Sequence, residues 1–202
     1  WSSPAVALTL PLHPSFKTNG RSHDGWRHAE RNQQAIQFAK AGFIAVAVDH
    51  PGNGELSDLA KHRGTTSDDR RTIARYLIDF GRNYVGLSAF QKMKILEWLR
   101  TQPFVDAERI AVGGHSLGAE PALAMAVLDP SISAMIWNDA IDPDILRARV
   151  RTKPNARGLR PGATHLMHSI PGMWEWFDWP DLAAAMAPRP LIITEGGATR
   201  TL

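Results

Sequence analysis

RIAVGGHSLGAEPALAMAVL, residues 109–128, passes from a β-prone run through three closely spaced glycines into a strong helix former. The apolar run 109–113 predicts a strand, and the alanine-rich residues 119–127 predict a helix. Ser116 stands at their junction, inside the pentapeptide Gly114-His115-Ser116-Leu117-Gly118. A serine at the tip of a sharp strand-to-helix turn needs small neighbours, because its backbone is strained there. The pattern therefore predicts a turn that exposes the Ser116 hydroxyl above a sheet.

This predicted turn suits nucleophilic chemistry. The helix after Ser116 aims its first N–H groups at the space beside the hydroxyl, which favours a developing oxyanion. We expect the backbone N–H of Leu117 to be one donor of an oxyanion hole. The alternative is a glycine-rich turn with no chemistry.

The rest of the chain alternates strand-like and helix-like segments. Apolar runs predict further strands at residues 5–10, 43–48, 133–137 and 191–194. Amphipathic or helix-prone segments predict helices at residues 26–40, 72–80, 88–100 and 119–128. Such alternation implies an α/β protein with a mostly parallel, doubly wound sheet and right-handed crossovers.

Length and spacing predict one domain with an insertion. The chain has 202 residues, of which 44% are hydrophobic, and this suffices for one sizeable core. Residues 140–187 exceed an ordinary crossover, so we expect an inserted cap or lid there. An aromatic cluster in this segment either offers a stacking platform to a sugar or aryl group or pins the cap to the core. Its members are Trp174, Trp176, Phe177 and Trp179.

Composition narrows the classes of partner. The net charge of +3 comes from one basic segment that holds Arg147, Arg149, Arg151, Lys153, Arg157 and Arg160. No aromatic-interleaved repeat or known nucleic-acid motif accompanies these cations, so a solvated surface is favoured over nucleic-acid binding. The chain has no Cys, which excludes disulfides and thiolate zinc sites. No apolar run reaches 18 residues, so we expect no membrane span.

Four segments resemble the α/β-hydrolase superfamily in their order and spacing. They are LPLH at residues 10–13, AGFIAVAVDHPGNGE at 41–55, GHSLGAE at 114–120 and APRPL at 187–191. The branch that they most resemble is the dienelactone-hydrolase-like and acetyl-xylan-esterase-like one. This resemblance covers most of the chain. It implies the α/β-hydrolase fold and a serine-dependent hydrolase of carboxylic esters, with acetyl and sugar esters as candidate substrates.

The resemblance also implies how such an enzyme works. Ser116 attacks the ester carbonyl and forms an acyl-enzyme, while the Leu117 N–H holds the oxyanion. A second donor is expected in the loop after residues 5–10. Pro14 replaces the usual glycine there and has no N–H, so Ser15 or Phe16 is the better candidate. The expected partner is a small-molecule ester, and no metal or organic cofactor is needed.

The catalytic acid has two candidates. In this fold the chain order is serine, acid, then histidine, and the acid normally follows the strand at 191–194. Glu195 is the carboxylate at that place. Asp139, directly after the strand at 133–137, is the alternative. Glu120, one helical turn after Ser116, is expected to be structural and to pair with a neighbouring loop.

The catalytic base is expected outside this sequence. His165 and His168 follow Ser116, but both precede the strand that should bear the acid, so chain order argues against them. When the strand before Ser116 is counted as the family's fifth, the chain begins near the third and stops after the seventh. We therefore expect a fragment of a longer protein whose histidine lies beyond Leu202.

Two other functions stay open at this point. A serine peptidase of the prolyl-oligopeptidase type shares the fold and the turn, and a large upstream domain would favour it. A binding protein with a hydrolase fold and no base is the non-enzymatic alternative, and it should not react with a fluorophosphonate probe. The sequence leaves the compartment and the oligomeric state undetermined.

Overall fold

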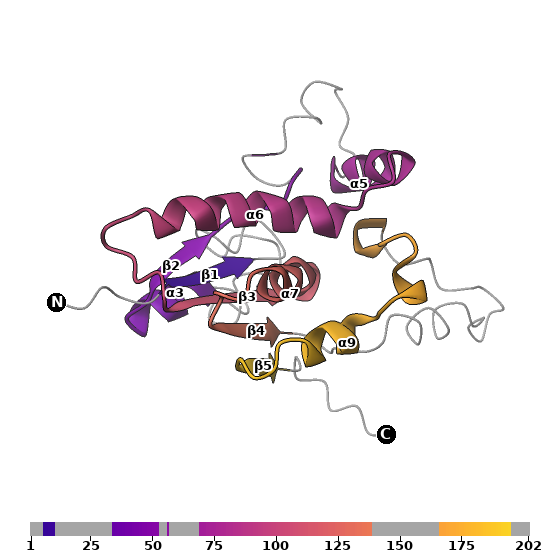
Figure 1. The fold of residues 1–202 in the computed structure, drawn as a ribbon. Coiled ribbons are helices and arrows are strands. Elements are labelled where there is room, and N and C mark those ends of the chain that lie inside the picture. Colours follow the sequence, from indigo (N-terminus) through magenta and orange to yellow (C-terminus); the bar gives the residue numbers. More distant parts are fainter. Residues whose placement is uncertain (1–5, 11–33, 53–55, 57–68, 139–165, 195–202) are drawn as a thin grey trace, which may run out of the picture.

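The computed structural model describes residues 6–10, 34–52, 56, 69–138 and 166–194 (Figure 1). Within these ranges, one sheet of parallel strands has the order β2-β1-β3-β4-β5. The strands are β1 (Val6–Leu10), β2 (Ile44–Ala47), β3 (Ile110–His115), β4 (Ala134–Asn138) and β5 (Leu191–Thr194). The predicted α/β class with a parallel sheet is confirmed.

Helices connect and cover these strands. They are α3 (Gln34–Lys40), α5 (Asp69–Asp79), α6 (Tyr84–Arg100), α7 (Ala119–Leu128) and α9 (Trp179–Ala184), with short 3₁₀ turns η3 (Ser116–Gly118), η4 (Leu166–His168) and η5 (Met173–Glu175). Helix α3 packs on β1 and β2, whereas α7 packs on β3 and β4 and contacts α6 and α9. In Figure 1 the strand arrows point toward the side on which α5 lies, and η4 contacts α5 and α6 there.

The strand order changes direction at β1. The chain leaves β1 through α3 and adds β2 to one edge, and it later returns so that β3 pairs with the other edge of β1. In open α/β sheets, ligands bind beyond the carboxyl ends of the strands at such a switch point. Because β3 leads directly into Ser116, the predicted nucleophile lies at this place.

Helix α7 lies in the core. Nearly all of its residues from Ala119 to Ala126 are buried, because the helix is apolar apart from Glu120. Beside it, the rings of Trp137 on β4 and Trp179 on α9 lie 5.9 Å apart, and both are fully buried. Burying about 200 Å² of apolar surface per ring contributes roughly 5 kcal/mol before entropic losses. The core therefore holds α7, and the turn that precedes it, from several sides.

The long helix α6 begins earlier than the sequence predicts. It starts at Tyr84 instead of Ser88, because Asn83 caps it: the Asn83 side chain accepts a hydrogen bond of 2.6 Å from the Gly86 N–H. Gly86 has low helix propensity, and its place in the first turn hid the true start. Of the helix predicted at 26–40, the structure describes residues 34–40.

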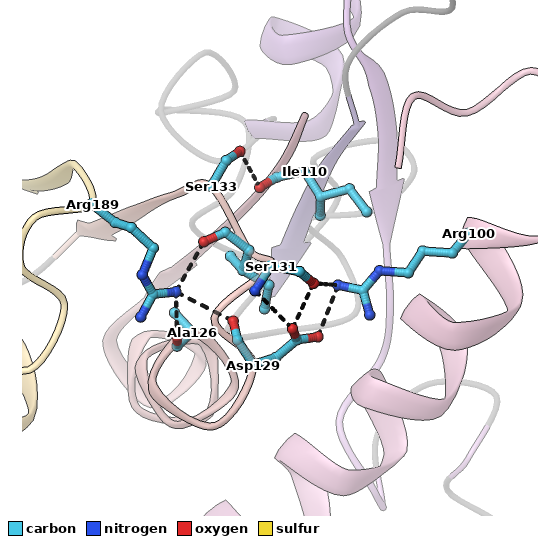
Figure 2. A network of polar contacts seen from close by, with 8 residues as sticks. Arg100, Ile110, Ala126, Asp129, Ser131, Ser133 and Arg189 are labelled. Carbon is cyan, nitrogen blue, oxygen red and sulfur yellow. Dashed lines mark hydrogen bonds and ion pairs between the residues drawn. The ribbon is translucent and has the colours of Figure 1, made fainter. Parts of the chain in front are cut away.

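A polar network surrounds the C-terminal end of α7, which is the end away from Ser116. Arg189 donates from Nη1 to the carbonyl oxygens of Ala126, Asp129 and Ile132 at 2.7, 3.2 and 2.9 Å (Figure 2). The last carbonyls of a helix lack intrahelical donors and carry partial negative charge. One guanidinium therefore donates hydrogen bonds to carbonyl oxygens at the end of α7 and in the turn that leads into β4.

Asp129 extends this network to α6. Its Oδ2 lies 2.8 Å from Nη2 of Arg100, and its Oδ1 accepts hydrogen bonds from the N–H and hydroxyl of Ser131 (Figure 2). Burial by itself would raise the pKa of Asp129, but the hydrogen bonds from Ser131 and Arg100, with the charge of Arg100, outweigh it. The pKa of Asp129 is therefore held below its ordinary value.

The predicted cap at 140–187 is described in its second half. Residues 166–187 contain η4, η5 and α9 and no strand, and residues 139–165, with the basic segment, lie outside the described ranges. The cap as a whole stays a prediction.

Candidate active site

The backbone at Ser116 is left-handed. Its φ of 51° is the one positive value for a residue other than glycine in the part of the chain that the structure describes. A serine in this conformation costs about 1–3 kcal/mol, so its surroundings must impose it. The strand–turn–helix context is as predicted: β3 ends at His115 and α7 begins at Ala119. Ser116 is partly exposed, whereas Leu117 and Gly118 are buried.

Gly114 of the pentapeptide is required for a steric reason. A Cβ on Gly114 would lie 2.1 Å from the carbonyl oxygen of Gly118 and 2.5 Å from the backbone nitrogen of Ala119. No side chain fits in that space, because the obstacle is backbone that cannot rotate away. The turn can therefore bring β3 and α7 this close only with glycine at 114.

The turn leaves N–H groups available beside Ser116. Residues 116–118 form η3, and the Ala119 N–H bonds back to the Ser116 carbonyl, so η3 leads directly into α7. The first N–H groups of a helical segment have no intrahelical acceptor and favour negative charge. Leu117 belongs to this group, which is the setting that its predicted oxyanion role requires. Ser15, the other predicted donor, lies outside the described residues.

Three neighbouring strands end in register at the same edge of the sheet. His115 pairs with Asn138, and Asn138 pairs with Thr194. The next residues after these strands are the nucleophile candidate and the two acid candidates, Ser116, Asp139 and Glu195. Asp139 and Glu195 themselves lie outside the described ranges. The choice between them stays a prediction.

Glu120 and His168 are in contact. Nδ1 of His168, in η4, lies 2.7 Å from Oε1 of Glu120, in the first turn of α7. Glu120 is 2% exposed. The expectation that Glu120 pairs with a neighbouring loop is confirmed, although no pattern in the sequence identifies His168 as the partner. Among the described residues, no histidine side chain is hydrogen-bonded to Ser116; His165 lies outside them.

One face of α6 binds the chain after β2. Lys92 Nζ donates to the carbonyl oxygen of Asp49 at 3.1 Å, and the Tyr84 hydroxyl donates to that of Pro51 at 2.6 Å. Between them, the Ser88 hydroxyl lies 2.8 Å from His50 Nδ1. These three α6 side chains recur every fourth residue, so they share one helix face. Sequence reasoning missed this polar stripe, although the spacing was its visible signal.

A pocket of about 360 Å³ lies along the run from His168 to Glu175. The aromatic cluster divides here: Trp179 is buried in the core, whereas Trp174 and Trp176 are 51% and 84% exposed. Trp174 also lines the pocket. The packing interpretation therefore holds for Trp179, and the exposed rings fit the platform interpretation.

The described ranges lack a metal-binding cluster and a membrane-spanning helix. They contain no group of three or more His, Cys, Asp or Glu side chains placed to hold a metal ion. No helix among them has the length and hydropathy that crossing a bilayer requires.

Known proteins resemble the chain in sequence and fold. A candidate acetyl xylan esterase from Bacteroides fragilis is 35% identical, with a TM-score of 0.81 over 99% of this chain and 54% of its own. A glucuronoyl esterase from Solibacter usitatus has 18% identity and a TM-score of 0.56, over 95% of this chain and 55% of its own. The chain thus spans about half the length of these relatives, and the second shows likeness of fold alone. No curated protein matches the sequence.

The family comparison agrees with the geometry. The strained serine, the tight contact at Gly114 and the parallel sheet fit the fold that the four resembling segments of the sequence imply. The family model of the abhydrolases matches residues 6–202. The chain therefore belongs to the abhydrolase family and has the α/β-hydrolase fold.

Proposed function

We propose that this protein is a serine-dependent hydrolase of carboxylic esters and that Ser116 is its nucleophile. The observation that carries the proposal is the positive φ of Ser116 at the junction of β3 and α7. Strain of this kind persists only where the surroundings impose it. The strained conformation places the Ser116 hydroxyl beside the first N–H groups of a helix, which have no intrahelical acceptor. The similarity to a candidate acetyl xylan esterase over 99% of the chain supports the ester as substrate.

The proposed reaction has two steps. The Ser116 oxygen attacks the ester carbonyl while a histidine base takes its proton and passes it to the departing alcohol. Water, deprotonated by the same base, then attacks the acyl group, releases the carboxylic acid and restores Ser116. The Leu117 N–H stabilises the oxyanion in both steps, a role whose loss lowers kcat roughly 10²- to 10³-fold in comparable enzymes. Asp139 or Glu195 would orient the base.

Acetyl and sugar esters are the proposed substrates. The name of the Bacteroides fragilis relative points to acetyl esters on a sugar chain. Independently, Trp174 is half exposed and lines the pocket along residues 168–175. An exposed indole ring next to a pocket suits stacking against a ring-shaped alcohol.

Replacing Ser116 by Ala in the full-length protein tests the proposal. The turnover of p-nitrophenyl acetate should fall at least about 10³-fold, because no other group can form the acyl-enzyme. Ser133→Ala is the matched control, since Ser133 is exposed directly before β4 and its hydroxyl bonds the carbonyl of Ile110, at the opposite end of β3 from Ser116. Unchanged turnover in Ser116→Ala would refute the assignment.

A fluorophosphonate probe separates the alternatives. An esterase or a peptidase should label at Ser116, whereas a binding protein that lacks the base should not. Peptide p-nitroanilides tested beside acetyl esters then distinguish a prolyl-oligopeptidase-type peptidase from an esterase.

A further inference from the structure

The contact between Glu120 and His168 lies immediately beside the nucleophile turn. Glu120 stands in the first turn of α7, four positions after Ser116 in the sequence, and its side chain is 3% exposed. A carboxylate this buried needs hydrogen-bond donors, and the positive end of the helix dipole favours its charge at this position. Nδ1 of His168, at 2.7 Å, lies within hydrogen-bond distance of one of its oxygens.

One buried apolar cluster includes residues of the same two segments. Leu117 and Met167 belong to one buried apolar cluster, together with Ala74 and Tyr84. Leu117 follows Ser116 directly, and Met167 precedes His168 directly. The nucleophile turn and η4 are thus connected through an apolar cluster and a polar pair that use adjacent residues. Two contacts of different chemistry fix η4 better than either would alone.

The chain from η4 onward forms the pocket wall. His168 through Glu175 line the pocket of about 360 Å³, and His168 is also the partner of Glu120. His168 therefore lines the pocket and also binds the pocket wall to α7. The residues of the wall include Trp174, which is half exposed, and Glu175. An aromatic ring beside a carboxylate suits an alcohol that has a ring and hydroxyl groups.

We propose that Glu120 and His168 are positioning residues that hold the pocket wall against the nucleophile helix, so that the pocket receives the alcohol part of the ester. The inference rests on the proposed function of Ser116. In this proposal the pair acts through the place that it gives to residues 168–175. Loss of the pair should weaken binding of a large alcohol more than attack on a small activated ester.

The kinetic test compares two acetyl esters on the full-length protein. In Glu120→Ala and His168→Ala, KM for an acetylated methyl glycoside should rise about tenfold, and more than the KM for p-nitrophenyl acetate. Glu120→Gln keeps an acceptor oxygen and should recover most of the loss. The double variant should be little worse than either single one, because both remove the same contact. Glu97→Ala, on the exposed face of α6, is the matched control.

Two results would overturn the positioning role. Equal changes in KM for both esters, with a lower melting temperature, would make the pair a general structural contact. Loss of fluorophosphonate labelling in His168→Ala as complete as in Ser116→Ala would make His168 the base instead.

Hydrogen exchange tests the attachment without catalysis. In Glu120→Ala, amides of residues 166–175 should exchange at least about fivefold faster, while those of α7 keep their protection. Unchanged exchange at 166–175 would refute the attachment even in an active enzyme. If Ser116→Ala keeps full turnover, the proposed function fails, and the exchange result still stands or falls by itself.

Discussion

The two ends of α7 differ in backbone strain and in how well their polar groups are hydrogen-bonded. At its start, Ser116 holds a φ of 51° and a partly exposed hydroxyl, on a turn so tight that Gly114 cannot have a side chain. At its end, Arg189 gives donors to three carbonyls, and Asp129 is bound by Arg100 and Ser131. The comparison shows strain at the end where we propose chemistry and satisfied polar groups at the other. Stability and activity should therefore respond separately to substitutions at the two ends.

The largest effect is expected from Gly114→Ala, at the strained end. The new Cβ would meet the Gly118 carbonyl, so β3 and α7 must separate. A displacement of about 1 Å at Ser116 should lower kcat/KM roughly 10²-fold, and the free energy of unfolding should fall by about 2–4 kcal/mol. Ester hydrolysis and urea denaturation measure the two quantities.

The control for this variant is Gly81→Ala. Gly81 also has a positive φ, of 66°, but an added Cβ would meet nothing within 4 Å. It should lose about 1–2 kcal/mol of stability and keep its activity. Equal loss of activity in both variants would show that the tight contact at Gly114 has no special role.

Arg189→Met should give the converse result at the satisfied end. Removing the guanidinium leaves three carbonyls without their donor, so we expect a loss of about 2–3 kcal/mol in urea denaturation. The kcat of the folded enzyme should stay within about twofold of the wild type, because the start of α7 is unaffected. Arg75→Met, which removes an exposed ion pair with Asp79, should change stability by less than about 0.5 kcal/mol. A large fall in kcat for Arg189→Met would contradict the claim that the two ends of α7 affect stability and activity separately.

The smallest effect is a pH dependence at Asp129. Its pKa is lower in the folded protein than in the unfolded chain, so ionised Asp129 stabilises the fold above the ordinary carboxyl range. That contribution is lost as the pH falls below about 4, through the folded pKa. Asp129→Asn should therefore melt lower than the wild type near neutral pH, with a smaller difference at acid pH. A difference that is constant from pH 7 to pH 3 would contradict the lowered pKa.

Local signals and distant contacts differed in how well the sequence revealed them. The turn at Ser116 was predictable, because its glycines, strand and helix are consecutive in the chain and the steric need is local. The start of α6 was placed too late, because Asn83 caps it and Gly86 in the first turn obscures the pattern. The pairing of Glu120 with His168 joins residues 48 positions apart. No periodicity encodes such a contact, because it depends on how η4 packs on α5 and α6.

The burial of α7 has a consequence for how this protein loses activity. Most of the helix, including its whole first turn, is buried among other elements of the core, so the Ser116 turn cannot relax unless a large part of the domain opens with it. Such a segment belongs to the slowest-exchanging cooperative unit of a fold. Core substitutions far from Ser116 should then act by changing the fraction of molecules that are folded. Each molecule that stays folded would keep the turnover that we propose for the wild type, and the total activity would fall because fewer molecules are folded.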